Sequence, residues 1–122
     1  MPFESLEKLW IYKEAKALYI ELHGLLKGIK HEYNFVNQAD RSSQSACDNI
    51  AEMYGAYYYQ VKLASLRVAR KESYETINHL KKAKEGKILP VETCDELINR
   101  YEKLILGINK YISYITKRIP KK

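Results

Sequence analysis

Four tyrosines and a lysine lie within a nine-residue segment, at Tyr54, Tyr57, Tyr58, Tyr59 and Lys62. Aromatic and basic side chains together can stack on nucleic-acid bases and contact phosphates, as they do in single-strand binders. The alternative is that the rings pack near a helix junction and keep their hydroxyls hydrated, either at the rim of a bundle or between subunits. Successive helical residues point about 100° apart, so three consecutive tyrosines cannot share one exposed face. This geometry favours packing and assembly for Tyr57, Tyr58 and Tyr59.

The spacing between histidines and carboxylates shows whether the sequence could form a metal centre. A di-metal site in a helical bundle requires Glu-x-x-His pairs on two helices, and no histidine of this chain follows a glutamate at that spacing. Glu75 and His79 are one helical turn apart, but a single pair of this kind is more typical of a surface contact. We therefore predict no metal and no cofactor.

The serines of the segment RSSQS, residues 41–45, are the remaining candidates for nucleophilic chemistry. No histidine stands in a recognisable nucleophile motif with them, and no glycine-rich loop precedes a helix as in a phosphate-binding site. Small polar residues of this kind suit a close contact between helices. We predict that the protein is not an enzyme.

Asn49 and Glu52 are polar residues on a helix that should be packed over much of its circumference. Three residues apart, they share roughly one face and can pair with a polar or basic group on a neighbouring helix. An anion or metal contact is the functional alternative. We favour a structural or assembly role, shared with Gly55, because the sequence shows no second cluster of ligands.

The chain carries a net charge of +6. Such a balance raises affinity for nucleic acids and anionic surfaces, although solvated charge is the common explanation for basic runs. If the protein forms a ring, the same side chains repeat around it and their fields add. The candidate nucleic-acid contacts are Arg67, Arg70, Lys71, Lys81, Lys82, Lys110, Lys117 and Arg118.

A length of 122 residues predicts one domain, spanning residues 1–122, with a core that needs no metal or disulfide. Cys47 and Cys94 are far apart and outside any zinc-ligand spacing, which predicts reduced, packed thiols in a cytoplasmic protein. No apolar run approaches the roughly 18 residues of a membrane span, and no secretory leader is recognisable.

Apolar residues recur at helical spacing in four segments. The predicted helices cover about 4–27, 35–54, 58–84, and a last segment between Pro90 and Pro120. Gly28 closes the first, and Gly55 ends or bends the second, since glycine tolerates the left-handed conformation of a helix stop. A wide apolar stripe on the third predicts two neighbours. Short connections predict an all-α, antiparallel, up-down-up-down four-helix bundle.

Three stretches carry a resemblance to a known family. Residues 45–55, SACDNIAEMYG, resemble the Ser-Ile-x-x-Asn-Ile-Ala-Glu-Gly signature of the 23S ribosomal RNA intervening-sequence proteins, which are relatives of the accessory variability protein of diversity-generating retroelements. Residues 66–75 resemble that family's Ala-x-x-Ser-x-x-Glu segment, although Ser73 and Glu75 are only two apart. The opening FESLEKLWIYKEAKALYIEL is similar to its first helix. Met53 stands where the family has glycine, and Ala46-Cys47 replaces an Ile-Pro-like pair.

The resemblance implies a four-helix protomer that assembles into a homopentameric ring with a basic surface. For the retroelement relatives it also implies binding of nucleic acid and of a reverse transcriptase, and for the intervening-sequence proteins it implies a ribosomal RNA setting. Two functions stay open at this point. One is a nucleic-acid-binding accessory protein that uses its basic surface, and the other is a protein-interaction scaffold.

Overall fold

The computed structural model describes residues 6–120, and this part of the chain is helical with no β-strand. Its long helices are α2 (Trp10–Leu26), α3 (Tyr33–Gly55), α4 (Tyr59–Glu85) and α5 (Val91–Thr116). The prediction of an all-α protein is confirmed. Among residues 6–120, no helix has the combined length and apolar character that crossing a bilayer requires.

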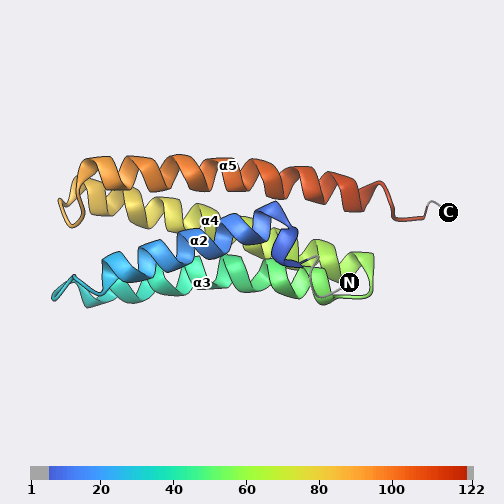
Figure 1. Cartoon of the computed structure of the whole chain (residues 1–122), viewed down its shortest axis with the longest axis horizontal. Helices are drawn as coiled ribbons and strands as arrows, with labels where there is room; N and C mark the ends of the chain where they lie inside the picture. The colour runs from blue at the N-terminus through green and yellow to red at the C-terminus, as the bar shows by residue number, and fades with distance from the viewer. Residues whose placement is uncertain (1–5, 121–122) are drawn as a thin grey trace.

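Each helix runs in the opposite direction to the one before it, and the molecule is elongated along the helix axes (Figure 1). The helix pairs in contact are α2 with α3, α3 with α4, α4 with α5, and α2 with α5. The α3–α4 connection and the end of α5 therefore lie at one end of the molecule, and the α2–α3 and α4–α5 connections lie at the other.

The core follows from the helical period of the apolar residues. Leu18 and Leu22 of α2, Leu66 of α4 and Leu104 of α5 are fully buried. Burying a side chain of this size stabilises the fold by about 1.5–3 kcal/mol. Both cysteines are also buried and unpaired, as predicted.

Polar contacts join the helices where the core residues are small. The hydroxyl oxygens of Ser42 and Thr76 lie 2.7 Å apart between α3 and α4, and both residues are fully buried. Between α5 and α2, Arg100 donates from Nη2 to Glu14 Oε1 at 3.0 Å and from Nη1 to Glu21 Oε2 at 2.6 Å. These contacts fix the rotation of each helix relative to its neighbour, because a shift of one residue would bury unpaired polar groups.

The first predicted helix differs from the structure. Residues 6–8 form a helical turn, Leu9 is extended with ψ 117°, and α2 begins at Trp10 rather than near residue 4. The predicted start near residue 4 lies outside the described residues. The last helix ends at Thr116, before Pro120.

The glycines end helices in a different way from the prediction. No described glycine has a positive φ; the left-handed residues are Glu32, with φ 66°, and Lys87, with φ 58°. Gly55 is the last residue of α3 and is followed by the extended Ala56. The predicted position of this helix end is correct, but it does not use a left-handed glycine.

Candidate nucleic-acid interface

Two segments of the chain contain basic residues and no acidic ones. Between Met53 and Lys71 the charged residues are Lys62, Arg67, Arg70 and Lys71, and between Lys103 and Arg118 they are Lys103, Lys110, Lys117 and Arg118. The first segment runs from the last residues of α3 through the α3–α4 connection to the middle of α4, and the second runs from the middle of α5 to just past its end. We call these two segments the basic end, because both lie at the same end of the molecule (Figure 1).

The packing of α4 against α5 brings the two segments together. Arg70 Nη1 donates to Asn109 Oδ1 at 2.8 Å across this contact, so Arg70 is partly used in joining the helices. Arg67, Lys71, Lys110 and Lys117 are exposed and are available to a ligand. The result is two neighbouring helix segments whose own charged residues are all basic.

The structure divides the eight sequence-predicted contacts into two groups. Six of them, Arg67, Arg70, Lys71, Lys110, Lys117 and Arg118, belong to the basic end. Lys81 and Lys82 lie nearer the opposite end of α4. Lys81 shares a surface hollow with Glu102, and Lys82 shares another with Glu32. Lys81 and Lys82 thus have acidic residues in their surroundings and lie apart from the other six, so the eight residues do not form one cluster.

Tyrosines accompany the basic residues at this end. Tyr57 is 86% exposed and Tyr58 is 68% exposed, and their rings meet edge to face with 4.9 Å between centroids. Tyr59 is also exposed. These rings are therefore not packed inside the chain. Packing between subunits stays a prediction.

A second aromatic group on α5 was missed in the sequence. The guanidinium carbon of Arg118 lies 3.7 Å from the centroid of the Tyr114 ring, and Tyr111 lies 5.5 Å from Tyr114. Burial raises the pKa of Tyr111, with smaller contributions from Tyr114 and Tyr54. The spacing of four residues between Tyr114 and Arg118 is the sequence signal for this contact.

The ammonium group of Lys62 is hydrogen-bonded to the backbone and positions the α3–α4 connection. Its Nζ donates to the carbonyl oxygens of Met53 at 3.0 Å and of Tyr54 at 3.3 Å. These carbonyls belong to the last turn of α3. An ammonium group is favourable there because the C-terminal end of a helix carries a partial negative charge. Burial lowers the pKa of Lys62. The contact fixes the chain just before the exposed tyrosines.

The Asn49 side chain is hydrogen-bonded within its own helix, α3. Its Nδ2 donates to the carbonyl oxygen of Ser45 at 2.9 Å and to Ser45 Oγ at 3.2 Å, both on α3. Glu52 is exposed and forms no ion pair within residues 6–120. Within residues 6–120, neither residue forms the predicted polar pair with a neighbouring helix, so an assembly role for either would involve another subunit.

An ion-pair cluster also joins α3 and α4, away from the basic end. Arg41 donates from Nη1 to Glu72 and from Nη2 to Glu75, both at 2.9 Å. Hydrogen bonds with Glu72 and Arg41 lower the pKa of Glu75, and desolvation lowers that of His79. Glu75 thus pairs with Arg41, and residues 6–120 contain no group of three or more His, Cys, Asp or Glu side chains placed to hold a metal ion.

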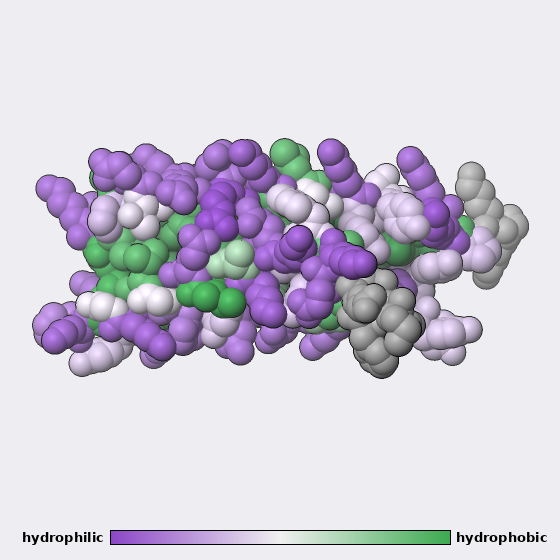
Figure 2. Space-filling view, in the orientation of Figure 1, coloured by the Kyte–Doolittle hydropathy of each residue, from purple (hydrophilic) through white to green (hydrophobic). Residues whose placement is uncertain are grey.

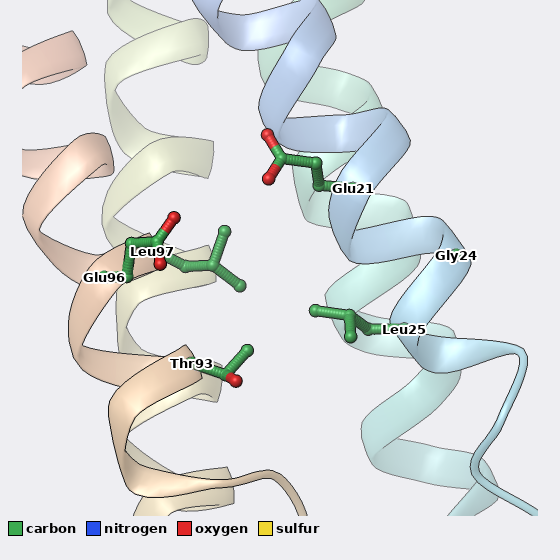
Figure 3. Close-up of a pocket in the computed structure, with 6 residues that line it drawn as sticks. All are labelled: Glu21, Gly24, Leu25, Thr93, Glu96 and Leu97. Carbon is green, nitrogen blue, oxygen red and sulfur yellow. The ribbon is translucent and has the colours of Figure 1, made fainter.

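A groove of about 360 Å³ lies between α2 and α5, toward the end opposite the basic end. Leu25, Thr93 and Leu97 give it apolar walls, and the carboxylates of Glu21 and Glu96 stand at its side (Figure 3). Figure 2 shows apolar surface in the left half of the molecule, between the upper and lower helices. Its acidic groups make this groove unsuitable for a polyanion.

The fold and this surface define the class of protein: a bundle of long helices with a basic, tyrosine-bearing end. The family model of the 23S rRNA-intervening sequence proteins matches residues 7–110, and the chain belongs to that family. Its fold is similar to the crystal structure of a protein with unknown function from the S23 ribosomal protein family of Bacteroides thetaiotaomicron. That comparison has a TM-score of 0.79 and 20% identity, and it covers 84% of this chain and 95% of the other. No curated protein matches the chain.

Proposed function

We propose that the protein is a non-enzymatic, cytoplasmic accessory protein that binds the phosphate backbone of nucleic acids through its basic end. The observation that carries the proposal is the absence of acidic residues from both segments of that end. A surface of one sign attracts polyanions, whereas mixed charges largely cancel beyond a Debye length. The family to which the chain belongs gives ribosomal RNA as the first ligand to test.

Phosphate contacts from Arg67, Lys71, Lys110 and Lys117 would supply most of the affinity, since these side chains are exposed. Each phosphate neutralised releases condensed counterions, so affinity falls steeply with salt. No described strand or helix presents an evident set of base-reading side chains at this end, and contacts to phosphate alone carry little sequence preference. Binding is therefore expected to be general rather than sequence-specific.

The proposed unit is an up-down-up-down four-helix bundle that assembles into a homopentamer, as the family resemblance implies. Exposed apolar residues on outer helix faces support association of copies, among them Ile20 on α2, Val61 on α4 and Leu106 on α5. Assembly would repeat the basic end five times around a ring, and its field would increase accordingly. The same resemblance implies a reverse transcriptase as the protein partner to test.

A protein-interaction scaffold is the alternative function. The groove between α2 and α5 favours it, because Leu25 presents apolar surface beside Glu96 and beside Glu21, which is paired with Arg100. A partner segment with an apolar side chain and a flanking lysine or arginine would fit this chemistry. In that case the charge of the basic end would serve solubility only.

The test is binding of the purified protein to a ribosomal RNA fragment and to duplex DNA across a salt series, with its sedimentation mass measured in the same buffers. The variant Arg67→Gln/Lys110→Gln removes two exposed charges from the basic end. Its control, Lys81→Gln/Lys82→Gln, removes the same charge from the other half of the molecule.

We expect affinity to fall steeply with salt, and the slope of log K against log salt to become shallower by about 2 in the first variant, since two phosphate contacts are lost. The control should change little. Absence of binding at low salt, or equal losses in both variants, would contradict the proposal and favour the scaffold. A monomeric mass at micromolar concentration would contradict the ring.

A further inference from the structure

We propose that the basic end selects unpaired nucleotides, because its exposed tyrosines stack on bases that a duplex keeps covered. This inference rests on the proposed binding of phosphates by the same end, and it adds the class of nucleic acid that fits there. The stacking groups are Tyr57 and Tyr58 at the α3–α4 connection, and Tyr114 with Arg118 at the end of α5. We call these four residues the stacking group.

Tyr57 and Tyr58 expose most of their side-chain surface to water. At 86% and 68% exposed, these rings leave a large apolar area in water, while the chain elsewhere buries Tyr101 completely. Their edge-to-face contact holds the two rings against each other without covering their outer faces. An aromatic face in water gains free energy when a base stacks on it, about 1–3 kcal/mol per base.

The local backbone makes this presentation stable. Ala56 is extended, with φ −75° and ψ 143°, and Tyr58 has a similar conformation before α4 begins at Tyr59. Tyr57 and Tyr58 thus lie in the connection, outside both helices, and their side chains are not held along a helix face. Lys62 holds the carbonyls of Met53 and Tyr54, which fixes where the connection leaves α3.

Tyr114 and Arg118 form a second flat surface at the same end. The Arg118 guanidinium lies over the Tyr114 ring at 3.7 Å, and both side chains are exposed. A guanidinium plane held on a ring is itself a stacking surface for a base and keeps its charge for a phosphate. Lysine in its place would keep the charge and lose the plane.

Charge identifies the occupant of these surfaces. The stacking group lies within the two segments that contain basic residues and no acidic ones. An incoming ligand therefore meets positive charge beside aromatic faces. A single strand offers both bases and phosphates to such a surface, whereas a duplex offers only phosphates at its sides. Single-stranded RNA or DNA can therefore contact both the aromatic rings and the basic side chains, whereas a duplex can contact only the basic side chains.

The experiment compares a 12-nucleotide single strand that carries one 2-aminopurine with the duplex made from it. Affinity is measured by anisotropy with a labelled strand, and stacking is followed by the 2-aminopurine fluorescence, which falls when the base stacks on a ring. The test variants are Tyr57→Leu/Tyr58→Leu, which keeps apolar bulk, and Arg118→Lys, which keeps charge. The control is Tyr33→Leu, since Tyr33 is 74% exposed at the other end of the molecule.

We expect the unmodified protein to bind the single strand at least tenfold more tightly than the duplex. The Tyr57→Leu/Tyr58→Leu variant should bind the single strand about tenfold more weakly and the duplex as before. When this variant is bound, the 2-aminopurine fluorescence should no longer fall. Arg118→Lys should show a smaller loss of the same kind. Tyr33→Leu should match the unmodified protein.

Three outcomes would overturn the inference. Equal affinity for single strand and duplex, unchanged in the tyrosine variant, would leave phosphate binding intact and remove the stacking role alone. Loss of the oligomer in the tyrosine variant, with unchanged affinity per protomer, would place these rings between subunits. If neither nucleic acid binds at low salt, the proposed function fails together with the inference.

Discussion

Trp10 lies so close to Gly107 that a side chain on the glycine would collide with the indole. A Cβ atom at residue 107 would stand 2.8 Å from Trp10 Cζ3 and 2.9 Å from Ile11 Cγ2. Gly107 is inside α5, where alanine would otherwise be preferred by about 1 kcal/mol. The absent side chain allows the beginning of α2 to approach α5 closely.

The variant Gly107→Ala should therefore lower the free energy of unfolding, by about 1–3 kcal/mol, because overpacking outweighs the gain in helix propensity. Thermal and urea unfolding measure this change. Gly24→Ala is the matched control, since Gly24 is inside α2 and a Cβ there meets nothing within 4 Å. It should raise stability by about 0.5–1 kcal/mol. Equal effects of the two changes would contradict the close approach of α2 to α5.

Glu75 predicts a pH dependence of stability. Its pKa in the folded protein lies below the ordinary value of 4.5, through hydrogen bonds with Glu72 and Arg41. Its ionised form therefore stabilises the fold above about pH 4.5, and this stabilisation is lost as the pH falls through the lowered pKa. Glu75→Gln should show a smaller fall in melting temperature between pH 5 and pH 3 than the unmodified protein.

The comparison for that experiment is Glu52→Gln, because Glu52 is exposed and has no ion pair in the described chain. This variant should keep the acid dependence of the unmodified protein. An unchanged pH profile in Glu75→Gln would mean that the Arg41 contact does not persist in solution.

The two cysteines should be unreactive in the folded protein. Burial raises the pKa of Cys47 to about 11, and burial also raises that of Cys94. The thiolate is the reactive form, and it is scarce at pH 8 when the pKa is this high. A colorimetric thiol reagent should titrate both cysteines rapidly in urea and only slowly without it. Rapid reaction of one thiol under native conditions would show that its helix opens locally.

The hydroxyl of Tyr101 should contribute nothing to stability. It is buried, and no hydrogen-bond partner for it exists within residues 6–120. An unsatisfied buried hydroxyl is unfavourable, so Tyr101→Phe should leave the free energy of unfolding unchanged or raise it by up to about 1 kcal/mol. Tyr101→Leu is the contrast, because it opens a cavity and should cost roughly 2–4 kcal/mol. A marked loss in Tyr101→Phe would indicate a bound water at the hydroxyl.

Asn49→Ala and Glu52→Ala test whether these residues act in assembly. Within residues 6–120, the Asn49 side chain hydrogen-bonds Ser45 on its own helix and Glu52 is exposed without an ion pair, so neither joins α3 to a neighbour there by a polar contact. We expect alanine at either position to weaken assembly or thermal stability more than nucleic-acid affinity, as sedimentation and binding titrations would show. The reverse ranking would identify a binding site.

The helical period was enough to predict the elements, because apolar spacing depends on each helix alone. The predicted segment 58–84 differs from α4, Tyr59–Glu85, by one residue at each end. The break at Leu9 was not predictable, since apolar residues continue through it and the close approach of Trp10 to Gly107 is a tertiary contact. Periodicity also says nothing of left-handed turns at residues such as Glu32 and Lys87, which are not glycine.

The candidate site was predictable in part. Arg67, Lys71 and Lys110 could be named from charge alone, but their separation from Lys81 and Lys82 depends on which acidic residues lie nearby in space. Pairing of Arg70 with Asn109 likewise depends on the rotation of α4 against α5. Tyr57 and Tyr58 are exposed in the connection between α3 and α4, which a purely helical interpretation of the three tyrosines did not include.

Basic residues gathered at one end of an elongated molecule also give it a permanent electric dipole along its long axis. Near a polyanion this dipole experiences a torque, which turns the basic end forward before any contact is made. Encounters are then oriented as well as accelerated, and both effects weaken as salt shortens the range of the field. A bound copy would stand on the strand by one tip, with its α2–α3 connection held far from the phosphates.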